Sequence, residues 1–171
     1  MRKLITFAFI FITLFSMAQT SLEKRVFEKI NKYRDSIGVS KLVWDSTCYK
    51  SSYIQSTYLS STNSVIGHSN PNKGYETMDD RYKKSGGKNK TLLGEICNGG
   101  SFGNYKVSDT LVEEKIAIKI VSLWENSKDH NKIMTSPDMK FGGVSVKVTT
   151  SSSGVKTWTH YDVFSVMVLS N

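Results

Sequence analysis

Two histidines and one glutamate are the side chains of this sequence best suited to chemistry near neutral pH. His68 and Glu95 lie in its middle third, and His130 ends a short motif that begins with Trp124 and includes Ser127. Imidazole and carboxylate groups bind divalent metals and transfer protons, so a cleft that held all three would be a chemical site. We therefore take His68, Glu95 and His130 as the candidate site, with Glu95 as the candidate catalytic residue.

Two neutral imidazoles and one carboxylate match the ligand set of a catalytic zinc site, which leaves one position open for water. Zinc or another divalent cation is therefore the candidate cofactor, and a bound metal would support hydrolysis. The alternative is a hydrogen-bonded polar cluster that orders a loop and needs no metal. Ser69 adjoins His68, but sequence neighbours do not form a catalytic triad, and a serine near a turn is usually a local hydrogen-bonding residue.

The first eighteen residues have the pattern of an export signal. Arg2 and Lys3 precede an apolar run from residue 4 to 15, and Ser16-Met17-Ala18 is the small-residue ending that a signal peptidase cleaves. We expect cleavage near Ala18, a mature domain over residues 19–171 without a transmembrane segment, and a secreted, periplasmic or cell-surface location. The alternative is an uncleaved anchor, for which the apolar run is short.

The net charge of +8 excludes little by itself, because lysines and arginines are scattered among acidic residues. A solvated basic face explains this distribution, and loose attraction to anionic cell-surface polymers is the alternative. The sequence contains no nucleic-acid recognition motif, so we expect no nucleic-acid partner.

Cys48 and Cys97 are the only cysteines. In an oxidising compartment they could form a disulfide, which would stabilise the fold by roughly 4 kcal/mol on the chain-entropy model. Two buried thiols are the alternative, because the geometry that a disulfide needs cannot be inferred from sequence.

The chain is helical first and strand-rich last. The capping-box pattern Thr20-x-x-Glu23 and apolar residues at helical spacing predict a first helix that ends at Gly38, and Asp45 is a good N-cap for a second. A short helix is expected over 77–84, and a third long helix from 108 carries the Trp124 motif at its C-terminal end. We predict strands over 92–97, 141–149 and 155–169, with a glycine-bearing loop over 98–106.

Helices before and between strands, followed by a hairpin, indicate an α+β domain whose helices cover an antiparallel sheet. Trp44, Trp124 and Trp158 are expected to be core aromatics, although each could line a ligand groove. His160, on the last strand, is interpreted as a structural or surface histidine.

The order of the motifs resembles that of the CAP superfamily, which comprises cysteine-rich secretory proteins, antigen 5 and pathogenesis-related proteins and is also known for SCP-like extracellular domains. The resemblance spans almost the whole mature chain and is closest to the bacterial branch. The matching elements are Asn31-x-x-Arg34, Gly38, Leu42-x-Trp44-Asp45, Gly67-His68-Ser69, Asp80-Arg81, Gly94-Glu95, Trp124-x-x-Ser127-x-x-His130 with Ile133, Phe141-Gly142-Gly143-Val144, and Trp158 with Val163-Phe164.

This resemblance implies a three-layer α-β-α sandwich with a cleft that holds His68, Glu95 and His130. Animal and plant members carry a second glutamate where this sequence has Ser127, so the acidic set is smaller here. Glu125 is not expected to replace it, because two residues along a helix are separated by about 200°. The family often has asparagine after Gly-Glu, whereas Ile96 and Cys97 follow here.

Two functions follow from these observations. The first is an exported CAP-like binding or interaction module whose cleft receives a small ligand or an extracellular or cell-wall partner, with or without a divalent metal. The alternative is a metal-assisted extracellular hydrolase that acts on peptide or cell-wall material. The missing acid at Ser127 weakens a general-base mechanism but leaves one led by Glu95 open.

Overall fold

The structure is a computed structural model that describes residues 19–64, 67–88, 92–152, 154 and 156–171. The predicted leader, residues 1–18, lies outside this part of the chain. The described helices are α1 (Ser21–Ser36), α2 (Ser46–Thr62), α3 (Met78–Lys84), α4 (Val112–Glu125) and α5 (Lys128–Met134), and the strands are β1 (Val43–Trp44), β2 (Leu93–Lys106), β3 (Phe141–Ser152) and β4 (Trp158–Ser170). Within those residues, no helix is both long and apolar enough to span a bilayer.

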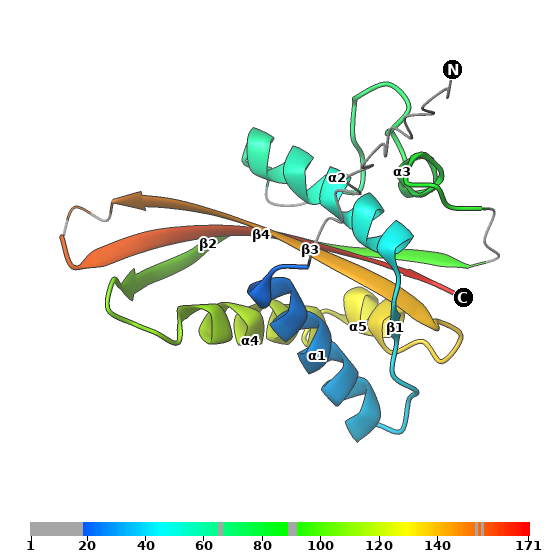
Figure 1. Ribbon diagram of the computed structural model, residues 1–171, viewed down its shortest axis with the longest axis horizontal. Helices are drawn as coiled ribbons and strands as arrows, with labels where there is room; N and C mark the ends of the chain where they lie inside the picture. The colour runs from blue at the N-terminus through cyan, green and yellow to red at the C-terminus, as the bar shows by residue number, and fades with distance from the viewer. Residues whose placement is uncertain (1–18, 65–66, 89–91, 153, 155) are drawn as a thin grey trace, which may run out of the picture.

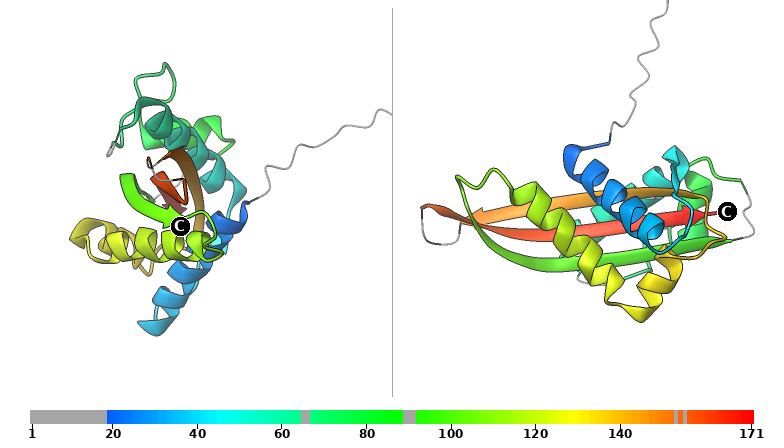
Figure 2. Two further views of the ribbon diagram at one scale, coloured as in Figure 1. Left: turned by 90° about the vertical axis from the view of Figure 1, so that its left-hand side faces the viewer. Right: turned by 90° about the horizontal axis from the view of Figure 1, so that it is seen from below.

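The predicted three-layer sandwich is confirmed. Helices α2 and α3 cover one face of the sheet, and α1, α4 and α5 cover the other (Figures 1 and 2). The sheet order is β1-β3-β4-β2, with β4 antiparallel to both of its neighbours. The sheet is mixed rather than purely antiparallel, because the two-residue β1 pairs in parallel with the start of β3.

Strand β4 is central and contributes to both layers. Its residues Val163, Met167 and Leu169 belong to the main core with α1 and α4. The alternate residues Phe164, Val166 and Val168 belong to the smaller clusters on the other face of the sheet, which include Leu59 of α2. This alternation follows from the two-residue period of a strand that is covered on both faces.

The first helix begins as predicted. Thr20 accepts a hydrogen bond from the Glu23 amide, and the Glu23 side chain accepts from the Thr20 amide, which completes the capping box. Glu23 is only 1% exposed and also accepts from the Val146 amide on β3 and from the Tyr49 hydroxyl. Burial and the Glu23 carboxylate raise the pKa of Tyr49 to about 12. One side chain therefore caps α1 and joins it to the sheet and to α2.

The serine-rich α2 packs closely on the sheet through small residues. Ser52 Oγ donates to the Gly143 carbonyl at 2.7 Å and accepts from the Val168 amide at 2.9 Å. Ser56 donates to Ser145 at 3.0 Å. A Cβ atom on Gly143 would lie 2.2 Å from the Tyr49 amide nitrogen, so only glycine permits this approach.

Two predicted boundaries were wrong. Residues 98–106 do not form a loop but extend β2, which pairs with β4 as far as Lys106. The glycines mark a register shift between Ser101 and Gly103, and Gly100 and Gly103 adopt positive φ angles there. The third long helix also ends early, at Glu125, because Ser127 is extended and starts the separate helix α5.

The far ends of β3 and β4 reach beyond the helices (Figure 2). Trp158 lies there and is 37% exposed, so its predicted core position was wrong, and the Lys106 ammonium lies 5.8 Å from its ring centroid. Trp124 is fully buried and Trp44 packs edge-on against Phe27, as expected of core aromatics.

Candidate functional site

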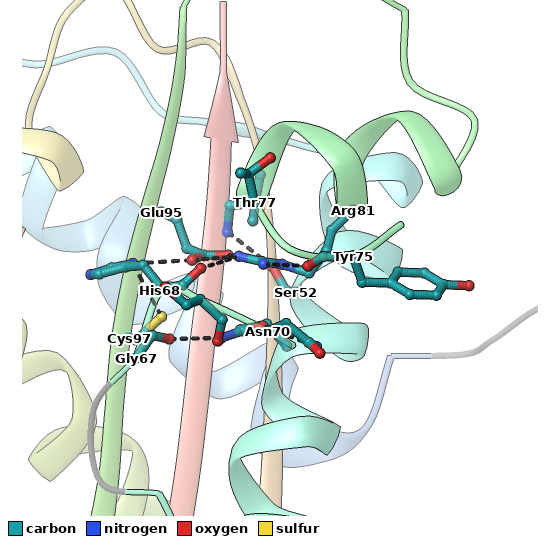
Figure 3. A network of polar contacts seen from close by, with 12 residues as sticks. Ser52, Gly67, His68, Asn70, Tyr75, Thr77, Arg81, Glu95 and Cys97 are labelled. Atoms are coloured by element: carbon teal, nitrogen blue, oxygen red, sulfur yellow. Dashed lines mark hydrogen bonds and ion pairs between the residues drawn. The ribbon is translucent and has the colours of Figure 1, made fainter. Parts of the chain in front are cut away.

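His68 and Glu95 meet, although 27 residues separate them in sequence. His68 lies in the segment after α2, and Glu95 lies near the start of the edge strand β2. Their side chains approach to 3.0 Å between Nδ1 and Oε1 (Figure 3). The Glu95 side chain is 3% exposed and that of His68 is 53% exposed, so the carboxylate lies beneath an accessible imidazole.

Arg81 of α3 binds the same carboxylate from the opposite side. Its Nη2 donates to both Glu95 oxygens, at 2.8 and 2.7 Å, and its side chain is fully buried. A buried carboxylate needs such a partner, because desolvation of an uncompensated charge costs several kcal/mol. The charge of Glu95 is thus balanced within the protein.

The same guanidinium fixes the segment that carries His68. Nη2 also donates to the His68 carbonyl at 3.1 Å, and Nη1 donates to the Tyr75 carbonyl at 3.0 Å (Figure 3). From the other side, Gln55 of α2 donates to the carbonyls of Gly67 and Ser69. Several donors on two helices therefore determine where the imidazole stands.

The contact with Glu95 determines which ring nitrogen of His68 carries the proton. A carboxylate paired with a guanidinium accepts hydrogen bonds, so Nδ1 of His68 carries the proton in this contact. The other ring nitrogen, Nε2, faces away from Glu95 (Figure 3). The hydrogen bond to Glu95 raises the pKa of His68, burial and Arg81 oppose the rise, and the Glu95 charge adds to it.

His130 lies next to this pair but lines a different hollow. His68, Ser69 and Glu95 border an open pocket of about 470 Å³. His130 borders a second pocket of about 210 Å³, together with Cys97, Trp124 and Ser127. Burial lowers the pKa of His130, and the neighbouring charge of His68 lowers it further. The two imidazoles therefore lie near enough for the charge of His68 to act on the pKa of His130.

Cys97 contacts His68 and also lines the pocket of His130. Its sulfur lies 3.7 Å from His68 Nδ1, while its residue lines the His130 pocket. Among the described residues, His68, Glu95 and Cys97 form a group whose potential ligand atoms lie within 4.8 Å of one another. Burial and the Glu95 charge raise the pKa of the Cys97 thiol, so this sulfur stays protonated.

These contacts decide which atoms fit a metal. Glu95 is occupied by Arg81 and His68, and a protonated thiol is a poor ligand. The His68 side chain is half-exposed, and an imidazole whose Nδ1 is held by a carboxylate is the usual form of a metal-binding histidine. Of this group, Nε2 of His68 is therefore the atom best suited to bind a divalent cation, with Glu95 as the residue that orients the ring.

The other residues considered from the sequence lie at the rims of pockets or on the sheet. Ser127 is the N-cap of α5 but makes no side-chain cap hydrogen bond, and it faces the His130 pocket. Ser69 is exposed on the rim of the His68 pocket. Glu125 lines a groove between α1 and α4, away from the histidines, as predicted. His160 contacts Ser101, Asn104 and Asp162 on the sheet.

Cys48 and Cys97 are both buried, and no disulfide joins them. Cys48 Sγ contacts the Ser170 hydroxyl at 3.7 Å, and Cys97 packs with Phe164 and Val166 in another cluster. Cys48 of α2 therefore packs near the C-terminal end of β4, and Cys97 of β2 packs nearer its middle. Of the two alternatives that the sequence leaves open, the structure contains the buried thiols.

Arg81 is the site residue that sequence reasoning missed. Its motif, Asp80-Arg81, resembles the family pattern, but nothing in the sequence pairs it with Glu95. The available signal was the capping-box pattern of Thr77 and Asp80, which predicts a short ordered helix and puts Arg81 in it. An arginine on such a helix, near a lone glutamate in an apolar strand, is a candidate buried ion pair.

Comparisons with known proteins agree with this fold. The structure resembles an extracellular protein with an SCP domain from Bacillus anthracis, with a TM-score of 0.63 and 18% identity over 88% of this chain. It also resembles an outer surface protein from Borrelia burgdorferi, with a TM-score of 0.61 and 17% identity over 91% of this chain. The chain spans 40% of the Bacillus protein and 96% of the Borrelia protein. At these identities the likeness shows the fold alone.

The sequence comparison identifies the family. A search of the curated proteins finds no significant match to the chain. The family model of the CAP, or cysteine-rich secretory protein, family matches residues 27–168, which include every residue of the candidate site. This chain is therefore a member of the CAP family.

Proposed function

We propose that this chain is an exported CAP-domain binding module that takes a divalent cation, zinc above all, at the β2 edge through His68 and His130. Residues 1–18 serve as the cleaved leader in this proposal, and residues 19–171 form the binding domain. The bound cation would supply a positive, ligand-exchanging centre to which a small extracellular molecule or a cell-wall partner could attach.

The observation that carries the proposal is the chain of contacts from Arg81 through Glu95 to His68. Arg81 balances the carboxylate, the carboxylate accepts from Nδ1, and Nε2 is left as an exposed acceptor. Such an arrangement fixes the tautomer and the orientation of a metal-binding imidazole before the metal arrives. A polar cluster that served only to order the loop would not need a half-exposed ring.

The hydrolase alternative receives less support from the same contacts. A general base must accept a proton from water or substrate, but both oxygens of Glu95 already accept from Arg81 and the side chain is 3% exposed. Ser127 supplies no second carboxylate at the neighbouring pocket. We therefore assign Glu95 a positioning role rather than a catalytic one.

An extracellular setting for this module is consistent with the similar structures, one from an extracellular protein and one from an outer surface protein. It is also consistent with the leader pattern at Arg2, Lys3 and the apolar run that follows. Mass spectrometry of the mature N-terminus tests this part, with a start near Gln19 as the expected result and a start at Met1 as the contradicting one.

Calorimetric titration of the mature protein with zinc tests the binding function. We expect saturable uptake near one equivalent that His68→Ala and His130→Ala abolish and Glu95→Gln weakens about 10- to 100-fold. His160→Ala is the matched control, because it removes an imidazole that lies outside the two pockets. Zinc uptake that is absent in the wild type, or unchanged in both cleft variants, would refute the proposal.

A further inference from the structure

A further groove, separate from the histidine pockets, lies on the outer side of α2. Its volume is about 330 Å³, and it runs between α2 and the segment that precedes α3. Helix residues 53, 54, 57, 58 and 61 form one wall, and residues 70, 72 and 75 form the other. The helix residues recur at spacings of three and four, so they share one face of α2, opposite the face that packs on the sheet.

The lining of this groove is neutral and rich in hydroxyl groups. Three tyrosines, a threonine and a serine supply five hydroxyls, and two asparagines supply amide groups. The lining residues are Tyr53, Ile54, Thr57, Tyr58, Ser61, Asn70, Asn72 and Tyr75. Among the residues that the structure describes, no charged side chain lines the groove itself, although two lysines contact its tyrosine rings.

The walls of the groove are held in place before any ligand binds. Asn70 is 2% exposed, donates to Gln55 of α2 and accepts from the Asn72 amide. The Tyr75 amide donates to the Asn72 carbonyl, and the Tyr75 carbonyl accepts from Arg81. The Tyr75 ring itself points away from the Arg81 network (Figure 3). The backbone of the turn that carries Tyr75 is therefore held in place.

Two of the three aromatic rings are also fixed by cations. Lys147 Nζ lies 3.5 Å from the centroid of the Tyr53 ring, and Lys84 Nζ lies 5.9 Å from that of Tyr75. Such a contact favours one orientation of the ring and covers one of its faces, while the hydroxyl group is not involved. The groove thus combines aromatic rings with hydrogen-bonding groups between them.

We propose that this groove binds a neutral oligosaccharide. The apolar C–H face of a sugar ring packs on aromatic side chains, and its many hydroxyls need partners that both donate and accept, as tyrosine hydroxyls and the exposed amide of Asn72 do. The lining residues themselves supply no ion-pair partner, which favours a neutral ligand. The proposed sugar site does not use the His68 side chain and is independent of zinc binding.

Titration with cellotetraose, maltotetraose and chitotetraose, followed by two-dimensional NMR of the mature protein, tests this inference. At least one sugar should shift the amide signals of residues 53–61 and 70–75 in a saturable way. Asn72→Ala and Tyr75→Ala should each weaken that binding at least about tenfold, whereas Asn126→Ala and Tyr33→Ala, which change the same residue types elsewhere, should not. Thermal unfolding of each variant would confirm that it is folded.

Three results would overturn the proposal. These are no saturable shift with any of the three sugars, shifts that both groove variants leave unchanged, and preferential binding of a proline-rich peptide in the same groove. His68→Ala should retain sugar binding, so a failure of the zinc proposal and a failure of this one are distinguishable.

Discussion

Removal of Arg81 is the most informative perturbation of the site, because it leaves a buried carboxylate without its counter-charge. In Arg81→Met, Glu95, which is 3% exposed in the wild type, keeps its contact with His68 but loses the guanidinium. Breaking a buried ion pair in this way costs about 3–5 kcal/mol. The carbonyls of His68 and Tyr75 also lose their donor, which adds about 1 kcal/mol or more where water does not replace it. We expect a loss of about 4–6 kcal/mol in the free energy of unfolding.

A second substitution should then restore stability. Glu95→Met in the Arg81→Met background removes the uncompensated charge, and replacement of a buried pair by apolar residues is often close to neutral. The double variant should be about 2–4 kcal/mol more stable than Arg81→Met, with a residual loss from the two carbonyls. Urea unfolding of the wild type, both single variants and the double variant measures this coupling.

Arg81→Lys provides a milder comparison if Arg81→Met does not fold. It keeps the charge but cannot reach the carboxylate and both carbonyls at once, so it should lose about half as much stability as Arg81→Met. A double variant that is less stable than Arg81→Met, or losses that simply add, would refute the assignment of Arg81 as the counter-charge of Glu95.

The remaining predictions concern the site and the packing that supports it. Titration followed by NMR should give His68 a pKa above its ordinary value of about 6.5 and His130 a pKa below that value. Glu95→Gln should lower the pKa of His68 but not that of His130. A raised pKa stabilises the folded state most when His68 is charged. The difference in free energy of unfolding between the wild type and Glu95→Gln should therefore be largest below pH about 6.5 and fall as the pH rises through the pKa of His68 in the folded protein. A difference that grows with pH would contradict this. Glu23→Gln should lower the free energy of unfolding by about 2–3 kcal/mol, because it weakens the helix cap and the contacts with Val146 and Tyr49. Spectroscopic titration should also show the pKa of Tyr49 falling from about 12. An unchanged pKa would be inconsistent with the contact between Tyr49 and Glu23. Gly143→Ala should lower the free energy of unfolding, measured with urea, by about 3 kcal/mol, since its Cβ would meet the α2 backbone. Gly67→Ala, whose Cβ would make ordinary contacts, should lower it much less. Equal losses would show that α2 does not pack as described. Alkylation of the denatured protein without reductant should add two labels, one at each of Cys48 and Cys97, and an unlabelled product would reveal a disulfide instead.

The helices and the hairpin could be predicted from the sequence because their signals are local. Thr20 with Glu23, and Asp45 before α2, are capping residues whose partners lie three positions away. The alternation of Val144 and Val146 likewise reports a strand directly. The glycines of residues 98–106 were misleading, because a bulge and a loop both use them, and only pairing with β4 distinguishes the two.

The site was predictable only in part, because its decisive contacts are non-local. The types of His68, Glu95 and His130 pointed to a metal or proton site, and His68 does contact Glu95. Nothing in the sequence reveals that Arg81 donates to both oxygens of Glu95, and this contact is our reason for proposing a positioning role for Glu95 instead of a catalytic one. The separation of His130 into its own pocket follows from the break between α4 and α5 at Ser127.

The proposed function requires Glu95 to hold His68 so that Nε2 is presented to a divalent cation. Nitrogen-15 NMR of the imidazole, recorded above the His68 pKa before and after addition of zinc, measures this directly. We predict a proton on Nδ1 in both states and a shift of the Nε2 signal on zinc binding. A proton on Nε2 without zinc, or His68 signals that do not respond to zinc, would contradict the account.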